Sequence, residues 1–489
     1  MTDVTVPVEF SNSERLQPNS FGWLGQLFQS MAHMAPAIAV VSALPFMASR
    51  AGSALPLAMV FAGLLAMCLA YCLAQLTKKF YGASGYFQIH SQAIGSRVGF
   101  TTSWLFLIYE PLNLFSTAFG FGVFILEPFS DAYLGMHIAW WWAPLVANVV
   151  VTYICLANIK KSIRTTAVLA LIEVLIFVIL GIFIFLDSNA PIQSQYFHPS
   201  MSADGMGGLL FAFIWGFLCF VGYESGLPLT EETKKTTIST SKGLLWSVGL
   251  AAVFYIFVAY ITVLGFGGNN SAEFAQNFSS TANPYGVLML NAFGSIGPWI
   301  LFIAALNSTL ACCVASTNSA TRVMFALGRA RILPAWLGQT TMLNKVPKNS
   351  IFIASVISLL FTLFGMFLSK GGDQIAWFGL IGVLLVLPLL IIHFVTCISV
   401  FMAYRRSGEF NRWKHGLLPL VTGGMVLLPI WGAIYYNQQA PMSYAPWIVA
   451  IWFCIGIALY FWLRSIRPET LKRLEGEMAA LKTFGPAPD

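Results

Sequence analysis

The sequence predicts an all-α integral membrane protein that crosses the bilayer about twelve times. Of its 489 residues, 57% are hydrophobic and only 9% are charged, whereas soluble proteins carry roughly 25% charged residues. About twelve apolar runs approach the roughly 20 residues that a spanning helix needs. They lie near residues 23–49, 54–77, 100–126, 138–157, 165–186, 207–231, 243–266, 286–320, 351–368, 375–402, 417–436 and 445–464. The first and sixth runs are interrupted, which is the observation that points to a function.

The distribution of basic residues predicts the topology. If the spans alternate from a cytoplasmic N-terminus, 24 of the 26 Lys and Arg residues fall on the cytoplasmic side, and only Arg50 and Lys370 fall outside. Cytoplasmic loops of membrane proteins are enriched in Lys and Arg. Both termini are therefore predicted to be cytoplasmic, and the compact loops favour a bacterial plasma membrane. The net charge of +7 reflects this topology and not a nucleic-acid-binding surface.

Several function classes find no support in the sequence. The eight cysteines all lie within apolar runs, and no Cys/His pair has the spacing of a zinc site. Neither a phosphate-binding glycine loop nor a His-Glu-x-x-His pattern is present. A continuous polar pore, which a channel needs, is not visible either. The sequence thus argues against an enzyme and predicts no cofactor.

Two interrupted spans predict an internal repeat. The first carries His33 and Pro36 near its middle, and the sixth carries Gly222-Tyr223-Glu224. Proline removes a helix hydrogen bond and clashes with the preceding turn. Broken spans at matching positions in two halves indicate an inverted repeat around a central substrate site. The predicted organisation is given by residue range: a cytoplasmic tail 1–22, a first repeat 23–186 (spans 1–5), a second repeat 207–402 (spans 6–10), spans 11 and 12 at 417–464, and a cytoplasmic tail 465–489.

A broken helix offers two kinds of binding group. The N-terminus of a half-helix presents free N–H groups and the positive end of a dipole, which suit a carboxylate. The exposed carbonyl groups suit an ammonium group or a cation. A zwitterion that carries both groups therefore fits such a site.

Three motifs, in this order along the chain, carry a resemblance to a known family. They are residues 82–86 (Gly-Ala-Ser-Gly-Tyr) followed by Gly95, Gly99-Phe100 and Trp104; residues 220–225 (Phe-Val-Gly-Tyr-Glu-Ser) followed by residues 230–233 (Thr-Glu-Glu-Thr); and residues 322–329 (Arg-Val-Met-Phe-Ala-Leu-Gly-Arg) followed by Leu333-Pro334 and Val346-Pro347. Over almost its whole length the chain resembles the amino acid–polyamine–organocation transporter superfamily.

The resemblance implies a LeuT-like fold with a five-plus-five inverted repeat, broken helices 1 and 6, and two extra C-terminal helices. It also implies secondary active transport of an amino acid or a related amine by alternating access, through exchange or proton symport. The substrate would meet the unwound backbone of spans one and six, at Met34, Ala35, Pro36, Ala37, Ile38, Phe220, Val221, Gly222 and Tyr223. The chain departs from the family where Met34-Ala35-Pro36-Ala37 replaces a Gly-Ser-Gly type sequence. It also departs at Glu173, which stands where some proton-coupled members carry a lysine.

Four titratable residues within spans are candidates for proton coupling or gating. Glu224 is the foremost, and the alternative is that it caps the broken helix. Glu173 could bind protons, neutralise a cation or pair with an arginine. Glu110, which precedes Pro111, either faces the cavity or makes an interhelical hydrogen bond. His33 beside the first break is either a proton carrier or a packed core residue.

Two further sets of polar residues have alternative interpretations. Ser316 and Thr317, with residues 307–309 (Asn-Ser-Thr), could complete a sodium site, although small polar residues also mediate helix packing. A solvated inner rim is predicted at Glu231, Glu232, Lys234 and Lys235, and it could pair with the loop of residues 322–331. No metal other than this sodium alternative is predicted.

The remaining alternatives concern function and partners. The expected substrate is a small molecule, an amino acid or an amine. The other expected partner is the lipid bilayer, with possible proton coupling and no nucleic acid. A polyamine or amine permease is one alternative, and a membrane nutrient sensor without net transport is another. The sequence leaves a monomer and a homodimer equally open.

Overall fold

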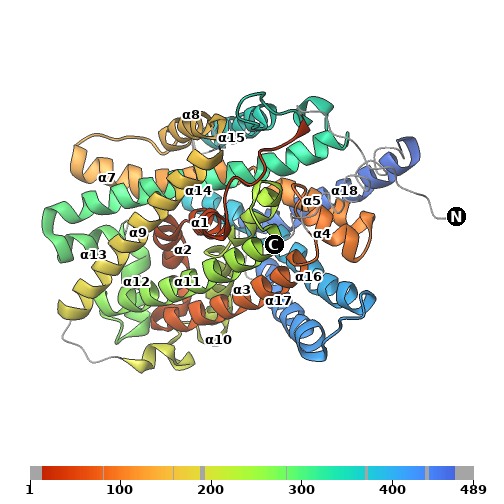
Figure 1. The fold of residues 1–489 in the computed structure, drawn as a ribbon. Helices are drawn as coiled ribbons and strands as arrows, with labels where there is room; N and C mark the ends of the chain where they lie inside the picture. Colours follow the sequence, from red (N-terminus) through yellow and green to blue (C-terminus); the bar gives the residue numbers. More distant parts are fainter. Residues whose placement is uncertain are drawn as a thin grey trace.

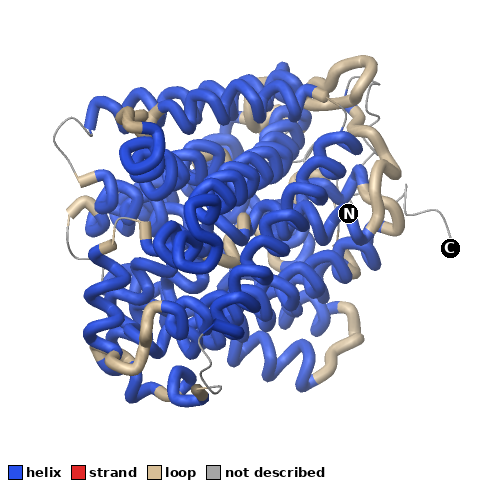
Figure 2. Tube along the Cα trace, turned by 90° about the vertical axis from the view of Figure 1, so that its left-hand side faces the viewer, coloured by secondary structure: helices blue, strands red, loops and turns tan. Residues whose placement is uncertain are grey.

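The computed structural model of the chain describes residues 14–80, 82–157, 159–187, 193–281, 283–368, 373–435 and 440–467. Most of both predicted tails, residues 1–13 and 468–489, and Lys370 lie outside the described residues. Within the described part the fold is all-helical, as predicted, and the only β-type pairing there is an isolated bridge between Phe21 and Thr233. Figure 2 shows helices that fill the molecule, joined mostly by short loops.

The α-helices of the first half begin with the two parts of the first broken span. They are α1 (Trp23–Met34), α2 (Pro36–Ala51), α3 (Leu55–Thr77), α4 (Tyr86–Ala93), α5 (Ser96–Tyr109), α6 (Asn113–Phe121), α7 (Glu127–Phe129), α8 (Trp142–Leu156) and α9 (Ile159–Asp187). Two π-helical segments, Gly122–Leu126 and Ser130–Leu134, flank α7 and continue the helical path of α6.

The second half begins with the other broken span. Its α-helices are α10 (Gly205–Leu218), α11 (Thr236–Gly265), α12 (Ser271–Ser280), α13 (Pro284–Phe293), α14 (Gly297–Arg329), α15 (Lys348–Leu368), α16 (Gln374–Arg406), α17 (Leu418–Tyr435) and α18 (Ala445–Ile466). A 3₁₀ segment, Tyr223–Glu232, follows α10 after a short turn.

Ten helical stretches of the described chain are long and apolar enough to cross a membrane, and the first of them, Trp23–Thr77, contains α1, α2 and α3. A shorter apolar helix, α8, adds to these. Many apolar side chains are exposed on this scaffold, such as Tyr153 of α8 at 80% and Trp447 of α18 at 73%. Because water disfavours so large an apolar surface, these helices suit contact with lipid chains.

The broken helices lie in the middle of the helical assembly. In Figure 1, α1 and α2 occupy the centre of the view, with α9, α11 and α14 around them. The helix α2 also packs against α10, and α1 packs against the 3₁₀ segment Tyr223–Glu232. The two interrupted spans are therefore neighbours, and both are surrounded by protein and not by lipid.

Candidate functional site

The first break is a single left-handed residue between two helices. Ala35 has φ 48° and ψ 64°, α1 ends before it, and α2 begins after it at Pro36. A left-handed conformation costs a residue other than glycine about 1–2 kcal/mol. Proline at the first position of a helix loses nothing, since its missing N–H would have no partner inside the helix. The sequence Ala-Pro thus ends one helix and starts another.

Side chains from distant helices already bind the N–H groups at the start of α2. The N–H of Ala37 donates to Glu173 Oε2 of α9 at 3.2 Å, and the N–H of Ile38 donates to Ser308 Oγ of α14 at 3.2 Å. The N–H of Ala39 donates to the carbonyl of Ala35 at 2.9 Å. Every N–H of this first turn therefore has a protein partner.

The second break depends on a glycine. Gly222 has φ 103°, and a Cβ at this position would overlap the imidazole ring of His33. Only glycine combines this backbone conformation with so close an approach. The N–H of Gly222 donates to Glu224 Oε2 at 3.2 Å, and the hydroxyl of Tyr109 donates to Glu224 Oε1 at 3.0 Å. Glu224 therefore caps the broken helix, which is the structural alternative for this residue.

Direct hydrogen bonds join the two breaks. The hydroxyl of Ser30 in α1 donates to the carbonyl of Tyr223 at 2.6 Å, and the hydroxyl of Ser225 donates to the carbonyl of Gln29 at 3.4 Å. Each interrupted segment thus provides hydrogen-bond donors for backbone carbonyl groups of the other.

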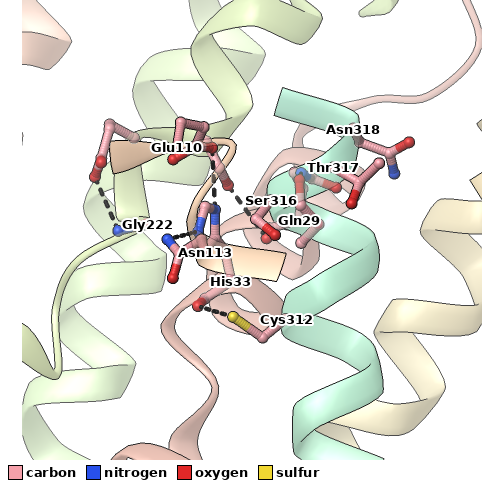
Figure 3. A network of polar contacts seen from close by, with 12 residues as sticks. Gln29, His33, Glu110, Asn113, Gly222, Cys312, Ser316, Thr317 and Asn318 are labelled. Carbon is pink, nitrogen blue, oxygen red and sulfur yellow. Dashed lines mark hydrogen bonds and ion pairs between the residues drawn. The ribbon is translucent and has the colours of Figure 1, made fainter. Parts of the chain in front are cut away.

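His33 lies at the centre of a buried polar cluster, which Figure 3 shows. Its Nε2 is 2.9 Å from Nδ2 of Asn113 in α6, and its Nδ1 is 3.6 Å from Oε1 of Glu110. Because the Asn113 amide can only donate through Nδ2, Nε2 accepts, and the ring proton sits on Nδ1, facing Glu110. The thiol of Cys312 donates to the His33 carbonyl at 3.0 Å. The structure therefore brings His33 and Glu110 together beside the first break.

A small cavity of about 70 Å³ adjoins both breaks. Its lining is mostly apolar, with four hydroxyl or amide side chains and no charged one. The lining residues are Met34, Ala35, Ile38, Ala39, Ser42, Asn113, Ser116, Thr117, Gly120, Leu218, Val221, Phe378, Gly382 and Leu385. Of the nine backbone positions predicted to meet a substrate, Met34, Ala35, Ile38 and Val221 line this cavity, whereas Pro36, Ala37, Phe220, Gly222 and Tyr223 do not.

Aromatic side chains stand between this cavity and a larger hollow, which we call the vestibule, of about 690 Å³. Phe378 lines the cavity, and Phe46 and Phe124 line the vestibule. The rings of Phe124 and Phe378 have centroids 5.0 Å apart, and Phe46 stacks on Trp215 at 4.5 Å. This aromatic layer closes the cavity on the vestibule side.

Comparison with known proteins identifies the family. The amino acid permease family model matches residues 25–436, which include both breaks, the cavity and the polar cluster. The chain belongs to the amino acid permease family. The family resemblance of the three motifs is thereby confirmed, and members of this family are transporters and not enzymes.

The permease has distant relatives with assigned names. It is 21% identical to a branched-chain amino acid permease of Bacillus subtilis (strain 168) over 430 residues, which cover 85% of this chain and 86% of that protein. It is 24% identical to a branched-chain amino acid permease of Lactococcus lactis subsp. cremoris (strain MG1363) over 309 residues, 60% of this chain and 59% of that protein. It is 22% identical to the cationic amino acid transporter 3, mitochondrial, of Arabidopsis thaliana over 335 residues, 64% of this chain and 52% of that protein.

The predicted solvated rim of the permease is correct for Lys234 and Lys235, which are exposed, and wrong for Glu231 and Glu232, which are largely or fully buried. Glu232 is fully buried and binds Arg322 of α14 through two contacts, of 2.9 Å to Nε and 3.3 Å to Nη2. Glu231 binds Arg329 at 2.9 Å and accepts the N–H of Ala83 at 3.0 Å. Burial is possible because each charge meets an opposite charge, as buried ions require. The pairing with residues 322–331 is as predicted, but Arg322 and Arg329 lie in helix α14 and not in a loop.

Hydroxyl and amide side chains proposed for a sodium site donate hydrogen bonds to backbone carbonyl groups of the permease. Ser316 and Thr317 both donate to the carbonyl of Cys313, at 3.1 and 2.7 Å. Asn307 donates to the carbonyl of Leu169 at 2.7 Å. Among the described residues no group of three or more His, Cys, Asp or Glu side chains has the arrangement of a metal site. The sodium site stays a prediction to which these contacts add no support.

Sequence reasoning missed the partners of the predicted residues. Asn113 and Ser308 turn out to hold His33 and the α2 N-terminus, and Phe46 and Phe378 turn out to cover the cavity. Asn113 carries no local signal, because a lone amide in an apolar run resembles many packing residues. The pairing of Glu232 with residues 322–331 is predicted by the sequence, and the structure adds that Arg322 is the partner.

Replacement of Gly222 by alanine will destabilise the permease by at least about 2 kcal/mol, because the new Cβ meets His33 and φ is positive. The midpoint of thermal unfolding in detergent measures this. Gly424→Ala is the matched control, since a Cβ there meets nothing within 4 Å. Equal unfolding midpoints for the two variants would contradict the role given to Gly222.

Arg322→Met will destabilise the permease by about 3–5 kcal/mol, because it leaves the Glu232 carboxylate buried without its partner. The double variant Arg322→Met/Glu232→Leu will recover most of that loss. The pair Lys79–Glu409, whose side chains are 19% and 67% exposed, provides the control, and Lys79→Met will change the unfolding midpoint far less than Arg322→Met. A double variant no more stable than Arg322→Met alone would show that the pair does not act as a unit.

Proposed function

We propose that this permease is a secondary active transporter that moves an amino acid across a plasma membrane by alternating access, through exchange or proton symport. The observation that carries the proposal is the meeting of two broken helices beside a small cavity. Non-helical backbone at membrane depth is tolerated only inside protein or beside a cavity. A simple anchor or a passive helix bundle has no need of two such breaks at one place.

The proposed architecture has twelve crossings and a five-plus-five inverted repeat of the LeuT type. The repeats comprise residues 23–186 and 207–402, and residues 417–464 add two crossings. Support comes from the breaks themselves, at Ala35 in the first span and after Leu218 in the sixth. It also comes from the ten candidate spans, because the stretch Trp23–Thr77 turns back on itself between α2 and α3 and the shorter α8 adds a crossing.

The two sides of the cavity differ in a way that suits alternating access. On one side the buried pair Arg322–Glu232 and the pair Arg329–Glu231 join α14 to the 3₁₀ segment Tyr223–Glu232. On the other side only a layer of aromatic rings separates the cavity from the vestibule. We assign the charged side to the cytoplasm, because basic residues gather there. In this conformation the ion pairs close the cavity of the permease towards the cytoplasm, and a single layer of aromatic side chains separates it from the outside.

A neutral amino acid with a small apolar side chain is the proposed substrate. The cavity is lined by aliphatic and aromatic side chains and by Ser42, Asn113, Ser116 and Thr117, with no charged residue. A charged substrate side chain would lack a partner there, at a large desolvation cost. Two of the relatives are named as branched-chain amino acid permeases, which agrees with an apolar side chain.

A primary amine without a carboxylate is the second candidate substrate. Glu110, Glu173 and Glu224 are all buried near the breaks, and in the described part of the chain none of them forms an ion pair with a Lys or Arg. A cationic amine would lower the cost of burying these acids.

Uptake by proteoliposomes tests the proposal and separates the alternatives. Leucine and 3-methylbutylamine have the same side chain, so that only the carboxylate differs between them. The proposal expects leucine uptake and counterflow in leucine-loaded vesicles. Uptake of the amine alone would favour the second candidate, uptake without counterflow would indicate a channel, and binding without uptake would indicate a sensor.

Glu224→Gln will lower the rate of amino acid uptake roughly tenfold or more, because Glu224 joins the second break to Tyr109 through two hydrogen bonds. Glu273→Gln is the control, since Glu273 is exposed in α12. Wild-type rates over the whole pH range in Glu224→Gln would remove Glu224 from the mechanism.

Cysteine labelling tests the proposed orientation. With Cys454, the exposed native cysteine, replaced by serine, a membrane-impermeant maleimide will label Ser280→Cys beside the vestibule in intact cells. Ser465→Cys, at the exposed end of α18, will react only after the membrane is permeabilised. The reverse pattern would invert the topology and exchange the two sides of the cavity.

A further inference from the structure

The start of α2 holds a carboxylate of the protein at the place where a substrate carboxylate would bind. The N–H groups in the first turn of a helix point back along its axis, here towards the break. Ala35 and Ile38 line the cavity, and Ala37, whose N–H binds the Glu173 carboxylate, does not. Pro36 has no N–H, the Ile38 N–H is bound by Ser308, and the Ala37 N–H is bound by Glu173 Oε2. An amino acid therefore finds no free N–H at this break.

Glu173 is the partner that can be exchanged. Its side chain is fully buried, and its second oxygen, Oε1, has no hydrogen-bond partner among the described residues. No ion pair links it to a Lys, Arg or His in the described chain. What favours its charged form is the Ser308 hydroxyl, the Ala37 N–H and the positive end of the α2 dipole, and a carboxylate of the substrate would compete for these groups.

We propose that Glu173 is the resident anion of the first break, and that a substrate carboxylate replaces it at Ala37 while Glu173 takes up one proton. The hydrogen bond from Ala37 to Glu173 is lost, a hydrogen bond from Ala37 to the substrate forms, and the proton comes from water in the vestibule. Two carboxylates cannot both stay charged around one N–H in a buried site. This inference rests on the proposed function, since it requires an amino acid substrate.

The surroundings of Glu173 leave it as the proton acceptor. Two titratable side chains interact with it electrostatically, Tyr255 from α11 and Cys312 from α14. The hydroxyl of Tyr255 donates to the Met34 carbonyl at 3.0 Å, and the Cys312 thiol donates to the His33 carbonyl at 3.0 Å. The only titratable side chain of α1, His33, is held by Asn113 and faces Glu110. Each of these neighbours is thus already engaged elsewhere.

Calorimetry on the wild-type permease tests the proton directly. Binding heats are measured for leucine and for 3-methylbutylamine in buffers of different ionisation enthalpy, which gives the number of protons taken up per ligand bound. The proposal expects about one proton with leucine and none with the amine. No proton uptake with leucine would overturn it.

Two variants assign that proton to Glu173. In Glu173→Gln and Glu173→Ala the uptake will vanish, and the ratio of the amine Kd to the leucine Kd will rise roughly tenfold, because the competing charge is gone. Glu127→Gln is the matched control, since Glu127 also accepts a backbone N–H, that of Trp140 at 2.7 Å, away from the breaks. A purely structural Glu173 would weaken both ligands equally and leave the ratio unchanged. Unaltered proton uptake in either Glu173 variant would also overturn the proposal.

The outcomes separate this inference from the proposed function. A wild-type permease that neither binds nor transports leucine contradicts the proposed function itself. A permease that transports leucine but shows the same proton uptake in Glu173→Gln contradicts only the role of Glu173.

Discussion

The rest of this permease depends on one constraint: the backbone N–H and carbonyl groups at two broken helices have no partner within the helix and must find one elsewhere. An N–H or carbonyl group without a partner costs several kcal/mol in a membrane interior, where no water replaces the lost hydrogen bond. At the first break the groups are satisfied by Glu173, Ser308 and the hydroxyl of Tyr255. At the second they are satisfied by Glu224 and Ser30. These five side chains come from five different parts of the chain, so the breaks hold the central helices together.

Acidic side chains have the same task at both breaks. Glu173 binds the N–H of Ala37, and Glu224 binds the N–H of Gly222. Each interrupted span therefore has a carboxylate at a buried N–H group that has no partner within the helix. The positive end of a helix dipole makes these places favourable for negative charge. In the exchange proposed for Glu173, capping and substrate binding are one role, because the substrate carboxylate replaces the cap.

The charged pairs and the aromatic layer close the cavity by different means. Arg322 and Glu232 form a bidentate buried ion pair, which is costly to separate once it is desolvated. Phe46, Phe124, Phe378 and Trp215 meet through ring contacts, and side chains of this kind can rotate aside one at a time. The cavity is therefore more strongly closed on the side of the ion pairs than on the vestibule side.

The sequence by itself determined the helical spans, the membrane class, the family and the position of both breaks, because these follow from local properties. The length of an apolar run shows that a helix can cross the membrane. Pro36 after Ala35 and Gly222 before Tyr223 each change the backbone conformation of only the few residues around them. Only the tertiary structure decided what each break binds. Glu173 lies 136 residues from Ala37, so no local pattern relates them. The burial of Glu232 was mispredicted for the same reason: whether a charge near a span end is solvated depends on the helix that packs over it.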